Sequence, residues 1–107
     1  MLYLCESLTN TNAHCVPMIG LLTGKAIMHT QLTNLGLHQA SFPDGTIRGH
    51  TFHYSTLKCT LTPLTHTKSA QHHGTPEPIY RTGKLTASFL HYYFPSNPEV
   101  TAQLFLP

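Results

Sequence analysis

The feature that most constrains the fold is a Pro-Asp-Gly turn signal at 43–45, which separates the segments LHQASF (37–42) and TIRGHTFHYSTL (46–57). Proline, aspartate and glycine favour tight turns because they supply the fixed or positive φ angles that a chain reversal needs. The two segments are therefore predicted to be neighbouring antiparallel strands. A second pair of strands is predicted in PIYRTGKLTASFLHYYF (78–94), around a tight Thr-Gly turn at 82–83.

Helices are predicted at the two ends of the chain. LYLCESL (2–8) has apolar residues at helical spacing. PEVTAQLFL (98–106) follows Asn97, a preferred N-cap residue, and begins with a proline, so Val100, Leu104 and Phe105 are predicted to share one face of a final helix. The remaining segments are predicted as a turn at 9–14, an edge strand in 15–22, a strand followed by a turn in 25–36, and an exposed, mobile loop at 62–78.

The expected fold class is α/β, with mixed or antiparallel strands and a C-terminal helix. With 107 residues, the chain is long enough for one domain at most. Only 9% of the residues are charged, against roughly 25% in ordinary soluble domains. A surface so poor in charge indicates that more protein normally covers part of it. We therefore expect residues 1–107 to be part of an α/β domain rather than a whole one.

Composition also excludes several kinds of partner. The formal charge of +2 is too small, and the basic residues are too scattered, for a nucleic-acid interface. No apolar stretch near the start is long enough to cross a membrane. The three cysteines form no Cys-x-x-Cys pair and cannot all pair internally, which favours free thiols and a cytoplasmic location.

Nine histidines raise the question of a metal site. Structural zinc usually has closely paired ligands in recognisable spacings. Two residues separate the histidines of GHTFH, and on a strand their side chains would point to opposite faces. We therefore expect no metal site, although a zinc-binding module stays open as an alternative. The candidate ligands are His50 and His53, with Cys15, Cys59, His72 and His73 as further members.

Three stretches in a fixed order carry a family resemblance that covers nearly the whole chain. They are LYLCESL with PMIGLL, then RGHTFHYS (48–55), then LTASFLHYYFPSNP (85–98). Together they resemble the C-terminal part of the cobyrinic acid a,c-diamide synthases, a family of glutamine-dependent amidotransferases of cobalamin biosynthesis. RGHTFHYS is the most discriminating motif against the related cobyric acid synthases. The motifs do not separate the family from the nickel-sirohydrochlorin diamide synthases.

The resemblance implies a partial class I glutamine amidotransferase domain, flavodoxin-like in fold. In the family, such a domain releases ammonia from glutamine, and an N-terminal synthetase domain uses ATP and magnesium to activate carboxylates of the corrin precursor. A cysteine attacks the glutamine amide, and a histidine transfers the proton to the leaving ammonia. The histidine of the family motif Ala-Ser-x-x-His-x-x-Phe falls on His91. His91 is therefore the predicted catalytic base, placed at the end of a strand.

Two departures from the family pattern bear on activity. Tyr93 stands where many class I glutaminases have a glutamate. The family's nucleophile lies in a Cys-Gly-Gly elbow just before the segment that Met1 begins, so we expect neither the nucleophile nor the synthetase domain within this chain. Cys5 lacks the flanking glycines of an elbow and is expected to be buried. The chain is expected to be inactive alone; the alternative is a stand-alone, non-enzymatic α+β module.

Overall fold

A computed structural model describes residues 1–70 and 74–106, and the chain forms two compact units. The first unit comprises Met1–Thr33 and His53–Thr62. The second comprises Asn34–Phe52 and Pro63–Pro107. The described residues form a mixed α/β structure of mixed and antiparallel strands with one α-helix, which is near the C-terminus. No helix among them has the length and apolar character needed to cross a bilayer.

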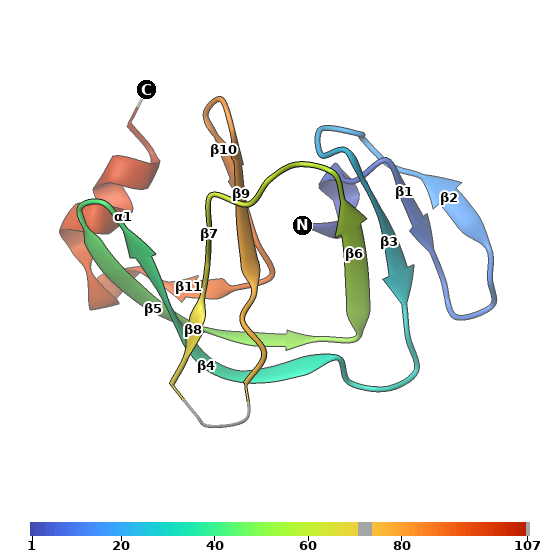
Figure 1. Cartoon of the computed structure of the whole chain (residues 1–107), viewed down its shortest axis with the longest axis horizontal. Coiled ribbons are helices and arrows are strands. Elements are labelled where there is room, and N and C mark those ends of the chain that lie inside the picture. Colours follow the sequence, from blue (N-terminus) through green and yellow to red (C-terminus); the bar gives the residue numbers. More distant parts are fainter. Residues whose placement is uncertain (71–73, 107) are drawn as a thin grey trace. The chain divides into compact units, whose positions relative to one another are not determined.

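The first unit is built on a four-stranded sheet in the order β2-β1-β3-β6 (Figure 1). β1 runs antiparallel to β2 and parallel to β3, and β3 runs antiparallel to β6. The predicted edge strand is confirmed, because β2 lies at the end of the sheet and all three of its residues are exposed. The strands are β1 (Ser7–Thr9), β2 (Cys15–Pro17), β3 (Gly24–Met28) and β6 (Ser55–Cys59).

The helix predicted over 2–8 is wrong. Only the 3-10 helix η1 (Leu2–Leu4) forms, and Cys5 is already extended with φ −74° and ψ 170°. The amide of Glu6 donates to the carbonyl of Gly24 at 2.8 Å, and β1 then pairs with β3. Partners distant in sequence supply the backbone hydrogen bonds here, so sheet formation overrides the helix propensity of the segment.

The second unit contains two sheets, ordered β11-β5-β4-β8 and β10-β9-β7 (Figure 1). The hairpin predicted around 43–45 is confirmed as β4 and β5. The turn at 82–83 is confirmed between β9 and β10, but the strand predicted after it divides into β10 and β11, which join different sheets. The strands are β4 (Asn34–Phe42), β5 (Gly45–His53), β7 (Thr65–His66), β8 (Lys68–Ser69), β9 (Pro78–Thr82), β10 (Leu85–Ala87) and β11 (His91–Tyr93).

A small apolar core holds the second unit together. Ala40 of β4, Ile79 of β9 and Leu90, which precedes β11, are buried against one another. The partly buried rings of Phe42 and Tyr92 pack on this cluster, with their centroids 6.5 Å apart. Residues from both sheets therefore share one core, and burying their apolar surface is the main favourable term for this packing.

The final helix is fixed by its cap. After the 3-10 turn η2 (Phe94–Ser96), α1 (Pro98–Leu104) begins with Asn97, whose Oδ1 accepts a hydrogen bond from the amide of Val100 at 3.2 Å. Asn97 Nδ2 also donates to the carbonyl of Thr46 at 3.1 Å, which ties the cap to β5. Val100 is buried as predicted, whereas Phe105 is 71% exposed. Phe105 lies beyond the end of the helix and touches the ring of Phe94 edge-on.

A buried polar network centres on Glu77, which is 4% exposed. Its Oε1 accepts hydrogen bonds from Asn34 Nδ2 at 2.7 Å and from Thr51 Oγ1 at 3.0 Å. Its amide donates to Thr67 Oγ1 at 2.8 Å, and that hydroxyl lies 2.7 Å from His38 Nδ1. Burial lowers the pKa of His38, although the nearby Glu77 opposes the shift, so the imidazole is neutral at neutral pH.

The network corrects the exposed loop predicted at 62–78. Within that range β7 and β8 are short strands, and the side chains of Thr67 and Glu77 are buried. Composition suggested a loop because the segment is rich in threonine, histidine and proline and has little apolar content. Pairing of β7 with β9 and of β8 with β4 orders it instead. Residues 71–73, which include His72 and His73, lie outside the described residues.

Replacing Glu77 with alanine should lower the free energy of unfolding markedly. The change leaves Asn34 Nδ2 with only the carbonyl of Thr75 as partner, and it deprives Thr51 of its acceptor. A buried polar group left unpaired costs about 1–3 kcal/mol. Urea titration measures the effect, with Glu6→Ala as the control because Glu6 is exposed. Equal stabilities for the two variants would contradict a structural role for the Glu77 network.

Candidate active site

His91 begins β11, the outer strand of its sheet, and its side chain is exposed. β11 pairs antiparallel with β5, and His91 lies directly opposite His50. The next pairs in the register are Tyr92 with Gly49 and Tyr93 with Arg48. The prediction that His91 would end its strand is therefore wrong: the chain bends after β10, and His91 is the first residue to rejoin a sheet.

Gly49 allows β11 to approach β5 closely. A Cβ atom built at position 49 would collide with the carbonyl oxygen of His91 and would lie 3.0 Å from the side chain of Leu90. Any other residue would have to push β11 away from β5. The order Arg-Gly-His at 48–50 thus has a structural reason. Gly49 lies opposite Tyr92, and the residues on either side of it, His50 and Arg48, lie opposite His91 and Tyr93.

Ser88 fixes the bend that delivers His91 to the sheet. Its Oγ accepts a hydrogen bond from the amide of Leu90 at 3.2 Å and donates to the hydroxyl of Tyr92 at 3.2 Å. Burial raises the pKa of Tyr92, and the Ser88 hydrogen bond only partly offsets that, so the phenol is un-ionised at neutral pH. The serine of the Ala-Ser-x-x-His motif therefore shapes the backbone just before the histidine.

The imidazole rings of His50 and His91 stack on each other. Their centroids are 5.0 Å apart and their planes differ by 14°. Both side chains are exposed, and none of the hydrogen bonds found in residues 1–70 and 74–106 uses a ring nitrogen of either one. Sequence reasoning singled out each histidine but did not pair them. The pairing depends on the β11–β5 register, which the motifs do not encode in their spacing.

A hollow of about 500 Å³ is lined by residues of the same two strands, among them Arg48 and Tyr93, each two residues from a histidine of the pair. The exposed side chains of Arg48 and Tyr93, neighbours in the register, line one part of it. The amide of Arg48 also donates to Ser96 Oγ at 2.9 Å, which holds this part of β5 to the turn after β11. A guanidinium group is suited to bind a carboxylate through two parallel hydrogen bonds. The hollow is lined by Gln39, Thr46, Arg48, Tyr93 and Ser96.

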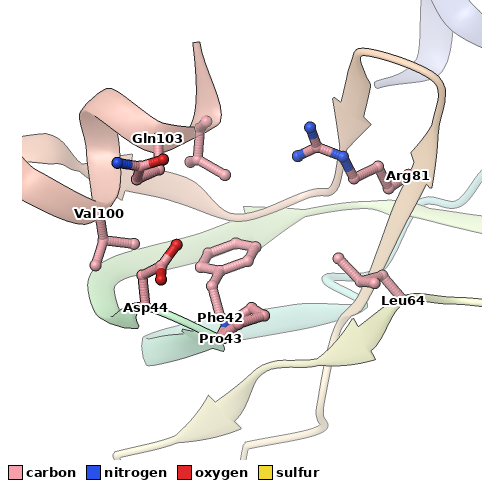
Figure 2. A pocket seen from close by; sticks show the side chains of 8 residues that line it. Phe42, Pro43, Asp44, Leu64, Arg81, Val100 and Gln103 are labelled. Atoms are coloured by element: carbon pink, nitrogen blue, oxygen red, sulfur yellow. The ribbon is translucent and has the colours of Figure 1, made fainter. Parts of the chain in front are cut away.

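A second hollow, of about 270 Å³, is separate from the histidine pair. Figure 2 shows Asp44 and Arg81 on opposite sides of it, with the ring of Phe42 between them. Arg81 Nη1 is also hydrogen-bonded to Thr86 Oγ1 at 3.1 Å. Since no residue of β11 lines this hollow, it is not part of the site around His91.

All three cysteines belong to the first unit, whereas His91 belongs to the second. Cys5 is fully buried as predicted, and burial raises the pKa of its thiol, which disfavours the reactive thiolate. Its Sγ is directed to the carbonyl of Met1 at 3.7 Å. Cys15 is exposed, and Cys59 is half-buried. All three are free thiols.

The metal cluster considered from the sequence does not assemble in the described residues. His50 lies beside His91, whereas His53 belongs to the first unit, where its Nδ1 bonds the carbonyl of Ser55 at 2.9 Å. Within residues 1–70 and 74–106, no group of three or more His, Cys, Asp or Glu side chains is placed to share an ion. His72 and His73 fall outside this part of the chain.

Comparison with known proteins finds relatives along the whole chain, although no protein-family model matches it. The chain is 42% identical to a hydrogenobyrinate a,c-diamide synthase of Pseudomonas aeruginosa and 43% identical to one of Stutzerimonas stutzeri. It is 37% identical to a cobyrinate a,c-diamide synthase of Herminiimonas arsenicoxydans. Each match covers 100% of the chain and 24–25% of the relative. The chain thus spans about a quarter of the length of these curated relatives.

Replacing Gly49 with alanine should separate β11 from β5. The added methyl group has no room against the backbone of His91, and overpacking of this kind costs about 1–3 kcal/mol. Cross-strand nuclear Overhauser effects between His50 and His91 should weaken or vanish in the variant. Arg48→Ala, an exposed change on the same strand, should preserve them. Unchanged cross-strand contacts in Gly49→Ala would show that the close approach is not needed.

Proposed function

The chain belongs to the hydrogenobyrinate and cobyrinate a,c-diamide synthase family, and on that premise we propose that it supplies the base of a glutamine-hydrolysing site. His91 is the residue in that role. The observation that carries the proposal is its placement: an exposed imidazole held on a paired strand, on the same strand as Tyr93, which lines a hollow of polar side chains. Catalytic groups work best when a rigid scaffold fixes the backbone beneath them.

The proposed reaction is hydrolysis of the side-chain amide of glutamine. A cysteine thiol gives its proton to His91, and the sulfur attacks the amide carbon. The imidazolium returns the proton to the nitrogen as the carbon–nitrogen bond breaks, which releases ammonia and leaves a glutamyl thioester. Water then cleaves the thioester to glutamate. Imidazole suits this exchange because it gains and loses a proton near neutral pH.

We propose that the cysteine comes from a part of the protein outside this chain. Cys5 is unsuited because it is buried and its thiol pKa is raised. His50 lies opposite His91 in the register and stacks on it, and Tyr93 follows two residues later on the same strand; neither is a carboxylate. The orientation of His91 therefore rests on the sheet, on Gly49 and on its stacking with His50 rather than on an acidic partner.

The rest of the proposed pathway follows the family. The relatives' names identify a diamidation of hydrogenobyrinate or cobyrinate, and we propose the same class of corrin carboxylates as acceptors of the released ammonia. A synthetase domain outside this chain would bind ATP and magnesium and activate those carboxylates. The flavodoxin-like class I glutaminase fold belongs to the same proposal. So does a cytoplasmic location, which the free thiols favour.

Replacing His91 with glutamine should abolish the use of glutamine but spare the use of ammonia. The test is a chimera in which this chain replaces the matching quarter of the Pseudomonas aeruginosa relative. Loss of a general base lowers glutamine-dependent ammonia release by roughly 100-fold or more. Amidation driven by added ammonium chloride needs no glutaminase base and should persist.

His66→Gln is the matched control, because His66 is also an exposed histidine of the second unit. It should leave both activities near the parent level. If His91→Gln reduced the glutamine-driven and ammonium-driven reactions equally, His91 would have a structural role or serve the synthetase reaction instead. Full retention of glutaminase activity would also exclude His91 as the base.

The chain alone should release no ammonia from glutamine, because a base without its thiol has no covalent intermediate to form. Ammonia release by the purified 107-residue chain is measured beside Cys5→Ser and His91→Ala variants. All three should match the buffer blank. Turnover by the parent that Cys5→Ser removes would place the nucleophile within this chain and overturn the proposed division of the site.

A further inference from the structure

We propose that His50 and His91 together form a binding site for a divalent transition-metal ion. Neither residue is a member of a Cys-x-x-Cys or His-x₃₋₅-His pattern, and 40 residues separate them in the chain. The β11–β5 register places them directly opposite each other, so the site exists only in the folded sheet.

The backbone geometry suits two imidazoles that share one ion. Directly opposite residues of antiparallel strands have Cβ atoms about 4.5–5.5 Å apart. The observed ring centroids, 5.0 Å apart and nearly parallel, agree with that spacing. Zinc and nickel bond imidazole nitrogens at about 2.0–2.1 Å, so two ligating nitrogens must lie within about 4 Å of each other. Small rotations of two exposed side chains reach that separation without moving either strand.

Both rings are available to a metal ion. The two side chains are exposed, and within residues 1–70 and 74–106 no hydrogen bond engages their ring nitrogens. By contrast, His38 is buried against Thr67, and His29 and His53 are hydrogen-bonded to Thr56 and to the carbonyl of Ser55. His14 and His66 are exposed as well. The pair is therefore distinguished from His29, His38 and His53 by access and from His14 and His66 by the stacking of its two rings.

The chemistry of the pair defines the class of ion. Neutral imidazole nitrogens suit zinc, nickel and copper(II), whereas calcium and magnesium prefer oxygen ligands. Two protein ligands leave coordination positions open for water or for a further donor. If His91 is the base proposed above, an ion bound here would occupy the nitrogen that must accept the thiol proton. The metal would then act as an inhibitor of glutamine hydrolysis.

Calorimetric titration of the untagged chain with nickel(II) tests the site. Nickel is the probe because imidazole binds it well, whereas cysteine sulfur, such as that of the exposed Cys15, favours zinc and copper(I). His50→Ala and His91→Ala should each weaken binding about tenfold or more, since even outer partners of metal ligands contribute that much. The double variant should lose less affinity than the sum of the two single losses, because removing one ligand already destroys the chelate and leaves a single, weakly binding imidazole.

Two controls keep the result interpretable. His50→Phe retains an aromatic ring against His91 but cannot ligate, so it should lose nickel as His50→Ala does. His66→Ala removes an exposed histidine elsewhere in the second unit and should leave the affinity unchanged. In the parent, paramagnetic nickel should broaden the amide resonances of Gly49 and Tyr92, which lie beside the pair in the register.

Unchanged affinity in either single alanine variant, or broadening centred away from Gly49 and Tyr92, would overturn the site. A loss in the double variant equal to the sum of the two single losses would also overturn it, because the two imidazoles would then act independently rather than as a chelate. The measurement needs no enzymatic activity. Its failure would therefore leave the role of His91 as a base untouched, and failure of that role would leave the metal site standing.

Discussion

The second unit depends on the buried residue Glu77, whose carboxyl group accepts hydrogen bonds from two other segments and whose backbone amide donates to a third. A buried polar group is tolerated only when its partners are in place, so Glu77 specifies how these segments meet. Its carboxyl group links Asn34 at the start of β4 to Thr51 near the end of β5, and its amide is hydrogen-bonded to Thr67, which lies between β7 and β8. The strands that carry the candidate site are thereby fixed from their inner side, away from the exposed histidines.

The outer side of the same strands bears the side chains of the candidate site. β5 alternates buried and exposed residues, so that Ile47, Gly49 and Thr51 face inward while Arg48 and His50 face outward. The missing side chain at Gly49 lets β11 approach, and that approach places His91 beside His50. Three features therefore build the site: the alternation of buried and exposed residues along β5, the glycine at position 49, and the bend before β11 that Ser88 holds by hydrogen bonds. In this arrangement the side chain of His91 stays exposed to solvent, and a substrate or a metal ion could reach it.

Local sequence patterns determined much of this structure. The Pro-Asp-Gly turn and the Thr-Gly turn each produced the predicted hairpin, because their backbone preferences act over only a few residues. Asn97 and the following proline began the final helix for the same reason. The Ala-Ser-x-x-His motif also led to His91, and homology along the whole chain identified the family.

Tertiary structure decided what those patterns left open. The segment after Met1 had helical spacing, yet Gly24 and β3 offered hydrogen bonds that made it a strand. Residues 65–69 had the composition of a loop, yet β4 and β9 paired with them and buried Thr67. His50 and His91 became neighbours only through the register of β11 on β5. The sequence alone determined the turns and the helix cap, and its motif singled out His91 as the candidate base. Contacts between distant segments decided the strands and placed His50 beside His91, because such contacts are formed by pairing and burial rather than by local propensity.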